Sequence, residues 1–171
     1  LAWASPMIVV DQPVQLIDAE IAIELRMEPS PVVEPGRPVA FAPVYLSHLR
    51  DAHAVERATI PVEKTRGPIL LVSGSDDQMW PSSALADIAM RRLETYRHPY
   101  PFRHLKYQGA GHLILVPGGP RTGRTLRLSR VEGLSDLVLA MGGTPKADAE
   151  AGEGAWRSLL EFLEAGVKAR K

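Results

Sequence analysis

The chain has 171 residues, which is enough for one domain with a sizeable hydrophobic core. Twenty basic and twenty acidic residues give a formal net charge of zero, which argues against a nucleic-acid groove or a charged membrane-binding surface. The absence of cysteine excludes disulfides and thiolate metal ligands within this sequence, and its apolar runs are too short for a transmembrane helix.

The first part of the chain predicts little regular structure. Residues 7–10 are a short strand candidate, and residues 21–27 alternate apolar and polar side chains as a half-buried strand does. Prolines and a glycine between positions 29 and 38 then indicate a loop. From Val44 the apolar residues recur at three- and four-residue spacings, which predicts one amphipathic helix that ends before Ile60-Pro61.

A short apolar strand is predicted at residues 69–72, and it breaks at Gly74 just before Asp76 and Asp77. The carboxyl ends of strands are where α/β sheets place their functional groups. Proline and hydroxyl residues at positions 80–83 then predict the start of a helix. Its apolar face carries Leu85, Ile88, Ala89 and Leu93.

A second strand is predicted at residues 102–107, and the glycine-rich loop after it presents His112. An acid after one strand and a histidine 35 residues later follow the order of an α/β-hydrolase catalytic triad, in which the nucleophile precedes both. The apolar residues 113–116 are predicted to pack beneath the histidine, and residues 117–125 to form an irregular basic loop.

A terminal helix is predicted after Gly142-Gly-Thr-Pro145, with Thr144 as its N-cap and Pro145 as its first residue. We expect this helix to cover the sheet with a single apolar stripe as its core-facing side. The stripe consists of Trp156, Leu159, Leu160 and Leu163.

Several of these stretches resemble the C-terminal domain of the acyl-CoA thioester hydrolase and bile acid-CoA:amino acid N-acyltransferase family. The resemblance implies an α/β-hydrolase fold, here the C-terminal portion of a mostly parallel sheet flanked by helices. It divides the chain into a poorly matched segment, 1–43, and part of a catalytic domain, 44–171. The matching stretches are Ile60-Pro-Val-Glu-Lys64, Gly67-Pro-Ile-Leu-Leu-Val-Ser-Gly-Ser-Asp-Asp-Gln-Met-Trp-Pro-Ser-Ser83, Gly109-Ala-Gly-His-Leu-Ile114 and Gly142-Gly-Thr-Pro145.

The resemblance implies that Asp77 is the triad acid and His112 the base. Asp76 competes for the first role, but counting Gly-x-x-Asp from Gly74 favours Asp77. The resemblance also implies a serine or cysteine nucleophile at a strand-to-helix elbow that precedes this region, and the sequence itself contains no Gly-x-Ser-x-Gly elbow. We therefore interpret the chain as part of a longer enzyme and predict that it is inactive alone.

Plainer interpretations stand beside these. Taken alone, Asp76 and Asp77 are most often a turn pair and His112 an ordinary loop histidine. Trp80 either forms a wall of the acid loop or packs under the following helix. Arg121 and Arg124 either contact coenzyme A phosphates or belong to a solvated loop. The remaining histidines are expected to be packed or solvated side chains, with His104 a possible neighbour of the site; they are His48, His53, His98 and His104.

The function predicted from the sequence is hydrolysis of a fatty acyl-CoA or related ester. The alternatives are acyl transfer to an amino acid, another α/β-hydrolase activity such as an esterase or peptidase, and a non-catalytic scaffold with the same fold. We predict no cofactor, no metal, and no nucleic-acid or membrane partner, and leave the oligomeric state open. The C-terminal Lys168-Ala-Arg-Lys171 is not a peroxisomal signal, so the predicted location is the cytoplasm.

Overall fold

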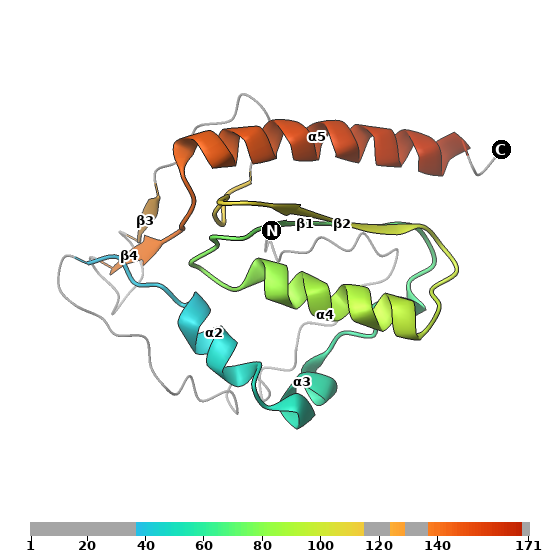
Figure 1. Ribbon diagram of the computed structural model, residues 1–171, viewed down its shortest axis with the longest axis horizontal. Coiled ribbons are helices and arrows are strands. Elements are labelled where there is room, and N and C mark those ends of the chain that lie inside the picture. The colour runs from blue at the N-terminus through green and yellow to red at the C-terminus, as the bar shows by residue number, and fades with distance from the viewer. Residues whose placement is uncertain (1–36, 115–123, 129–136, 169–171) are drawn as a thin grey trace.

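A computed structural model describes residues 37–114, 124–128 and 137–168 (Figure 1). The strand candidates at 7–10 and 21–27 lie outside the described residues. The elements in chain order are α2 (Ala42–His48), α3 (Ala52–Ala58), the 3-10 turn η1 (Val62–Lys64), β1 (Ile69–Gly74), α4 (Ser82–Thr95), β2 (Phe102–Tyr107), β3 (Thr125–Leu128), β4 (Leu137–Ala140) and α5 (Pro145–Lys168).

Two parallel strands form the central layer. β1 and β2 pair in a register that runs from Ile69 opposite Phe102 to Gly74 opposite Tyr107, so both strands end at the same edge. Both lie where the sequence predicts them, and β1 continues to Gly74. The mixed α/β class with a parallel sheet is therefore confirmed, while the α/β-hydrolase fold itself stays a prediction.

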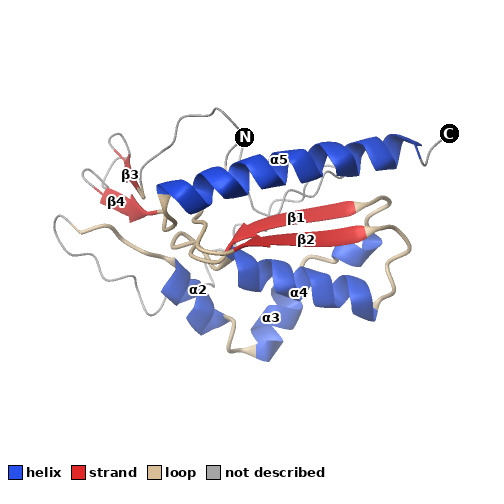
Figure 2. Cartoon of the chain, turned by 45° about the horizontal axis from the view of Figure 1, so that its top comes forward, coloured by secondary structure: helices blue, strands red, loops and turns tan. Residues whose placement is uncertain are grey.

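The long helices α4 and α5 cover opposite faces of this sheet (Figures 1 and 2). On the α4 side, alternate residues of β1 meet the apolar face of α4, because side chains alternate across a strand. Leu71 and Leu93 are fully buried there, and burial of each contributes about 1.5–3 kcal/mol to stability. This core consists of Val62, Ile69, Leu71, Ala86, Ala89 and Leu93, with Met90 and Phe102 packed against it.

Helix α5 begins at Pro145, and the Ala147 N–H donates to the Thr144 hydroxyl at 3.1 Å, so the predicted N-cap is confirmed. The predicted core stripe is wrong. Ala151 and Ala155 are buried, whereas the large side chains of the stripe are substantially exposed. Small residues allow the helix to approach the strands closely, which turns the bulky side chains outward. The exposed fractions are 40% for Trp156, 49% for Leu160 and 54% for Leu163.

The single helix predicted after Val44 is in fact two short helices, α2 and α3. The chain turns at Asp51, whose extended backbone leaves the helical region. The Asp51 carboxylate accepts hydrogen bonds from the N–H groups of His53 and Ala54, at 3.0 and 3.1 Å, and so starts a new helix. The apolar periodicity continues across Asp51, so the sequence pattern gave no indication of the break between the two helices.

A small antiparallel pair, β3 and β4, lies beside the carboxyl end of the central strands. The predicted loop 117–125 lies mostly outside the described residues, but its last residue, Thr125, begins β3. Val39 adds to this pair by donating its N–H to Val138 O at 2.7 Å. Within the described ranges, no helix is long and apolar enough to span a bilayer.

Candidate active site

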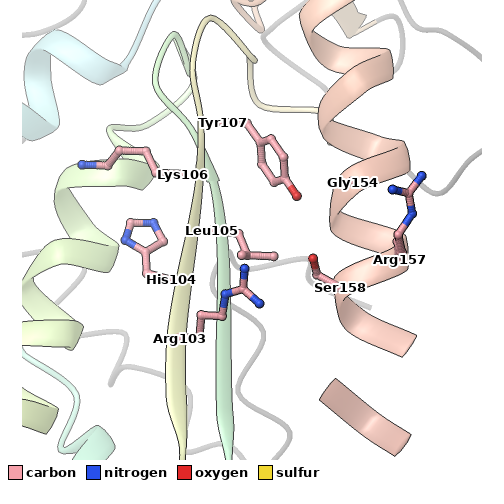
Figure 3. A pocket seen from close by; sticks show the side chains of 8 residues that line it. All are labelled: Arg103, His104, Leu105, Lys106, Tyr107, Gly154, Arg157 and Ser158. Atoms are coloured by element: carbon pink, nitrogen blue, oxygen red, sulfur yellow. The ribbon is translucent and has the colours of Figure 1, made fainter. Parts of the chain in front are cut away.

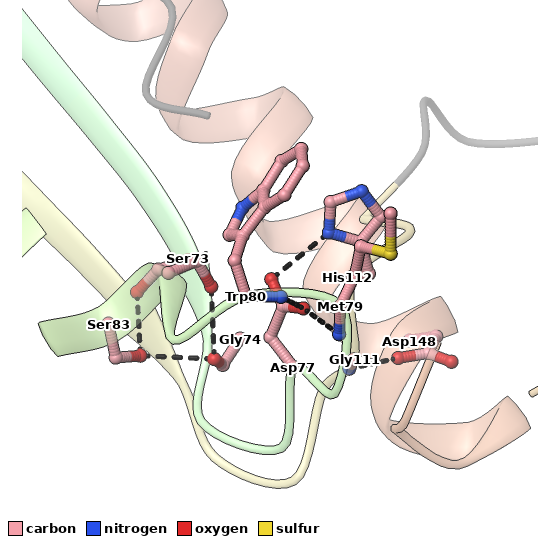
Figure 4. A network of polar contacts seen from close by, with 10 residues as sticks. Ser73, Gly74, Asp77, Met79, Trp80, Ser83, Gly111, His112 and Asp148 are labelled. Atoms are coloured by element: carbon pink, nitrogen blue, oxygen red, sulfur yellow. Dashed lines mark hydrogen bonds and ion pairs between the residues drawn. The ribbon is translucent and has the colours of Figure 1, made fainter. Parts of the chain in front are cut away.

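Asp77 and His112 meet just beyond the ends of β1 and β2 (Figure 4). The Nδ1 of His112 lies 3.1 Å from Oδ2 of Asp77. The two strands are parallel and end together, so the loops that follow them start side by side and bring these distant residues into contact. The predicted order of acid and histidine thus corresponds to a direct side-chain pair.

The carboxylate of Asp77 is fixed from both sides. Its residue is 7% exposed, and its Oδ1 accepts hydrogen bonds from the N–H groups of Met79 and Trp80, at 3.0 and 3.2 Å. An ionised carboxylate only accepts hydrogen bonds, so this contact favours the tautomer of His112 that carries its proton on Nδ1. Nε2 is the ring nitrogen that does not contact Asp77.

Trp80 forms a wall of this pair. Its ring meets the ring of His112 edge to face, with the centroids 4.3 Å apart and the planes at 89°. This contact restrains rotation of the imidazole. Of the two alternatives for Trp80, the structure places it against the acid and the histidine.

Asp76 does not contact His112 and instead connects two loops. Its Oδ1 accepts from the side-chain amide of Gln78 at 2.7 Å, and its Oδ2 accepts from the N–H of Gly143 at 2.9 Å. Both oxygens are engaged in tying the loop after β1 to the loop before α5. The pairing with His112 therefore belongs to Asp77, as counting from Gly74 favours.

Glycines allow the backbones of these loops to meet. A Cβ at Gly74 would lie 2.3 Å from the carbonyl oxygen of Ala110. A Cβ at Gly142 would lie 1.7 Å from the carbonyl oxygen of Asp76, and Gly142 also has a φ of +70°, which side chains rarely adopt. The loops that carry the site can therefore pack this closely only because Gly74 and Gly142 have no side chains.

The histidine loop is held from the opposite side by residues that the sequence analysis did not single out. The N–H of His112 donates to Met141 O at 2.8 Å, and the N–H of Gly111 donates to Oδ1 of Asp148 at 2.7 Å. The only local signal for this contact is an acid in the first turn of the helix after Gly142-Gly-Thr-Pro145.

A second serine, histidine and aspartate arrangement lies on the α4 side of the sheet. Ser73 Oγ is 2.7 Å from Nε2 of His104, and Nδ1 of His104 is 3.3 Å from Asp87 Oδ1. Ser73 is 2% exposed and its hydroxyl also contacts that of Ser83, at 2.9 Å, so a substrate cannot reach it. Burial lowers the pKa of His104 despite the nearby Asp87. We interpret the group as a structural network between the strands and α4.

The remaining predicted polar residues do not join the site. His53 is exposed on α3, and buried His98 has its ring nitrogens 3.2 and 3.1 Å from the carbonyl oxygens of Glu63 and Gly67. Arg124 is exposed, and Arg121 lies outside the described residues. In the described part of the chain, no three histidine, cysteine or acidic side chains gather as a metal site would require.

Comparison with known proteins gives a consistent result. A family model described as "BAAT / Acyl-CoA thioester hydrolase C terminal" matches residues 38–169. The chain is 36% identical over 104 residues to peroxisomal succinyl-coenzyme A thioesterase of Mus musculus, an alignment that covers 61% of this chain and 23% of that protein.

Two further relatives extend the comparison. Identity is 30% over 115 residues to acyl-coenzyme A thioesterase 6 of Homo sapiens, covering 67% of this chain and 26% of that protein. It is 35% over 104 residues to acyl-coenzyme A amino acid N-acyltransferase 1 of Mus musculus, covering 61% and 24%. The chain thus spans about a quarter of the length of these relatives.

Proposed function

Because this chain belongs to the BAAT / acyl-CoA thioester hydrolase C-terminal family, we propose that it supplies the acid and the base of an active site that cleaves acyl-CoA thioesters. Asp77 is the acid and His112 the base. The fold of the whole catalytic domain is then that of an α/β-hydrolase. The observation that carries the proposal is the 3.1 Å contact between Nδ1 of His112 and Oδ2 of Asp77.

In the proposed reaction, Nε2 of His112 removes the proton of a hydroxyl or thiol nucleophile as that atom attacks the thioester carbonyl carbon. The buried carboxylate of Asp77 holds the imidazole in the required tautomer and stabilises the imidazolium that forms. The C–S bond breaks as the tetrahedral intermediate collapses, and the departing coenzyme A thiolate takes the proton. His112 then takes a proton from a water molecule as the water attacks the acyl-enzyme carbonyl carbon. The bond between the acyl carbon and the nucleophile breaks, His112 returns the proton to the nucleophile, and the acyl group leaves as a carboxylic acid.

The nucleophile comes from a part of the protein outside this sequence. The sequence has no Gly-x-Ser-x-Gly elbow, and within the described residues no side chain hydrogen-bonds Nε2 of His112. Two triad members cannot form an acyl-enzyme, so the 171 residues alone are inactive. Coenzyme A release by the purified chain, lost in His112→Ala, would contradict this part of the proposal.

Acyl transfer to an amino acid is the second candidate, because one relative carries that activity in its name. The chemistry differs only in the acceptor, since an amine replaces water in the second half of the reaction. Offering water and glycine or taurine together and identifying the product by mass spectrometry separates the two candidates. An amide product would replace thioester hydrolysis with acyl transfer.

The decisive experiment measures coenzyme A release from a fatty acyl-CoA by the intact protein. His112→Ala is expected to reduce the rate by about 10⁴-fold or more, because the general base is lost. His53→Ala is the matched control, since His53 is exposed on α3. Near-normal turnover by His112→Ala would remove this site from catalysis. If the unmodified protein turns over acyl-CoA with neither water nor an amine as the acceptor, the scaffold alternative is favoured.

Location in the cytoplasm is part of the same proposal. Relatives of this chain carry the words peroxisomal and mitochondrial in their names, so related proteins occupy different compartments. Microscopy of the intact protein with an internal fluorescent tag tests the proposal, and concentration of the signal in an organelle would overturn it.

A further inference from the structure

A groove of about 380 Å³ lies between β2 and α5 (Figure 3). The side chains of Arg103, Leu105 and Tyr107 point from β2 toward α5, while His104 and Lys106 point to the other face of the sheet. From the helix, Ser158 points toward β2 (Figure 3), and Arg157 also contributes to the lining. This location differs from the Asp77–His112 pair, and the proposed reaction uses none of these side chains.

The charge of this groove is entirely basic. Its lining contains the two arginines and no carboxylate, although the chain as a whole has no net charge. Lys106 is neutralised by Asp87, whose Oδ2 lies 2.7 Å from its Nζ. Arg103 and Arg157 form no ion pair with any residue that the structure describes. Two guanidinium groups therefore remain uncompensated, one on each wall.

Two hydroxyl groups complete the set of donors. Those of Tyr107 and Ser158 lie near each other between the arginines (Figure 3). Burial raises the pKa of Tyr107, so its phenol stays protonated near neutral pH and can donate a hydrogen bond. Gly154 makes room for this phenol, because a Cβ there would lie 2.9 Å from the Tyr107 hydroxyl oxygen. The groove thus combines two arginines with two neighbouring hydroxyl groups.

We propose that this groove binds a phosphate group, held by the guanidinium groups of Arg103 and Arg157 and by the hydroxyls of Tyr107 and Ser158. Guanidinium groups match the geometry of phosphate oxygens and bind them through charge-assisted hydrogen bonds. Donors on two walls suit a group with three or more acceptor oxygens. The phosphate belongs either to coenzyme A or to a free phosphate.

Isothermal titration calorimetry of the intact protein with inorganic phosphate, coenzyme A and pantetheine tests this. Arg103→Gln and Arg157→Gln are each expected to weaken the phosphate-bearing ligand by about tenfold or more, the effect of one lost charge-assisted contact. Pantetheine lacks phosphate, so its binding is expected to be unchanged. Both arginines are exposed, so neither substitution removes a buried side chain.

Arg91→Gln is the matched control, because Arg91 is exposed on α4 and the substitution changes the net charge equally. If only coenzyme A is weakened by the groove variants, its phosphates are the ligand; if inorganic phosphate is weakened as well or instead, the site accepts free phosphate. The proposal would be overturned if the Arg103 and Arg157 variants bound inorganic phosphate and coenzyme A as tightly as the Arg91 variant does. The readout is binding, so the result is independent of the catalytic roles of Asp77 and His112.

Discussion

The carboxylate of Asp148, in the first turn of α5, accepts a hydrogen bond from the backbone N–H of Gly111 at 2.7 Å. Gly111 directly precedes His112, so a helix on one face of the sheet fixes the loop that carries the candidate base. This contact joins the packing of α5 to the position of the imidazole.

Replacing Asp148 is therefore expected to lower the stability of the protein. Asp148→Ala leaves the Gly111 N–H without its charged acceptor and is expected to lower the free energy of unfolding by about 1.5–3 kcal/mol. Asp148→Asn keeps an acceptor oxygen and is expected to lose less. Urea unfolding of both variants measures the difference, and equal stability of Asp148→Ala and the unmodified protein would show that the contact contributes nothing.

Asp77 and Asp76 are expected to respond differently to the same chemical change. Asp77→Asn keeps the fold but loses about 10⁴-fold in turnover of the intact protein, because the amide no longer stabilises the imidazolium. Asp76→Asn weakens the loop contacts with Gln78 and Gly143 and is expected to cost about 1–2 kcal/mol of stability while turnover stays within about tenfold. Circular dichroism and coenzyme A release measure the two effects. The roles would be exchanged if Asp76→Asn were the inactive variant.

Gly142→Ala is predicted to destabilise the site region severely. The new Cβ would clash with the carbonyl oxygen of Asp76, and a φ of +70° is unfavourable for alanine. We expect a loss of about 3 kcal/mol or more. Gly67→Ala is the control, because a Cβ there meets nothing within 4 Å and should change stability by less than about 0.5 kcal/mol. Thermal unfolding of both variants gives the comparison, and similar melting temperatures would contradict it.

Stability is predicted to fall in acid through Glu63. The hydrogen bond from Arg92 holds the pKa of Glu63 below its ordinary value, with one N–O distance of 2.7 Å in the bidentate pair. A carboxyl whose folded pKa is depressed contributes stability above its unfolded pKa, and this contribution is lost as the pH falls through the folded pKa. Denaturant midpoints between pH 6 and pH 3, measured for the unmodified protein and Glu63→Gln, should therefore converge in acid. If the midpoints of the two proteins differ by the same amount at every pH, the ionised Glu63 carboxylate does not contribute to stability.

The elements that position the site are readable from the sequence because their signals are local. The apolar run before Gly74 identifies β1, and residues 102–107, between Pro101 and the glycine-rich loop, identify β2. Polar residues after each strand then fall at the shared edge, and the family resemblance points to Asp77 and His112 among them.

Features that depend on contacts between distant residues could not be read in this way. Asp148 accepts a hydrogen bond from Gly111, 37 residues away, and Ser73 hydrogen-bonds His104, 31 residues away. No local sequence pattern predicts either contact. The periodicity of α5 identified an apolar face but not what that face packs against. Two buried alanines, Ala151 and Ala155, decide this, because they fit against the sheet more closely than Trp156 does.

Two amide protons near the site are held by carboxylates. The N–H of Gly111 donates to Asp148 and the N–H of Gly143 donates to Asp76. Their hydrogen-exchange rates therefore report how often these loops separate, and an equal free energy of opening at both positions is expected if the loops open together. The integrity of the Asp77–His112 arrangement can thus be followed by spectroscopy in a protein without substrate.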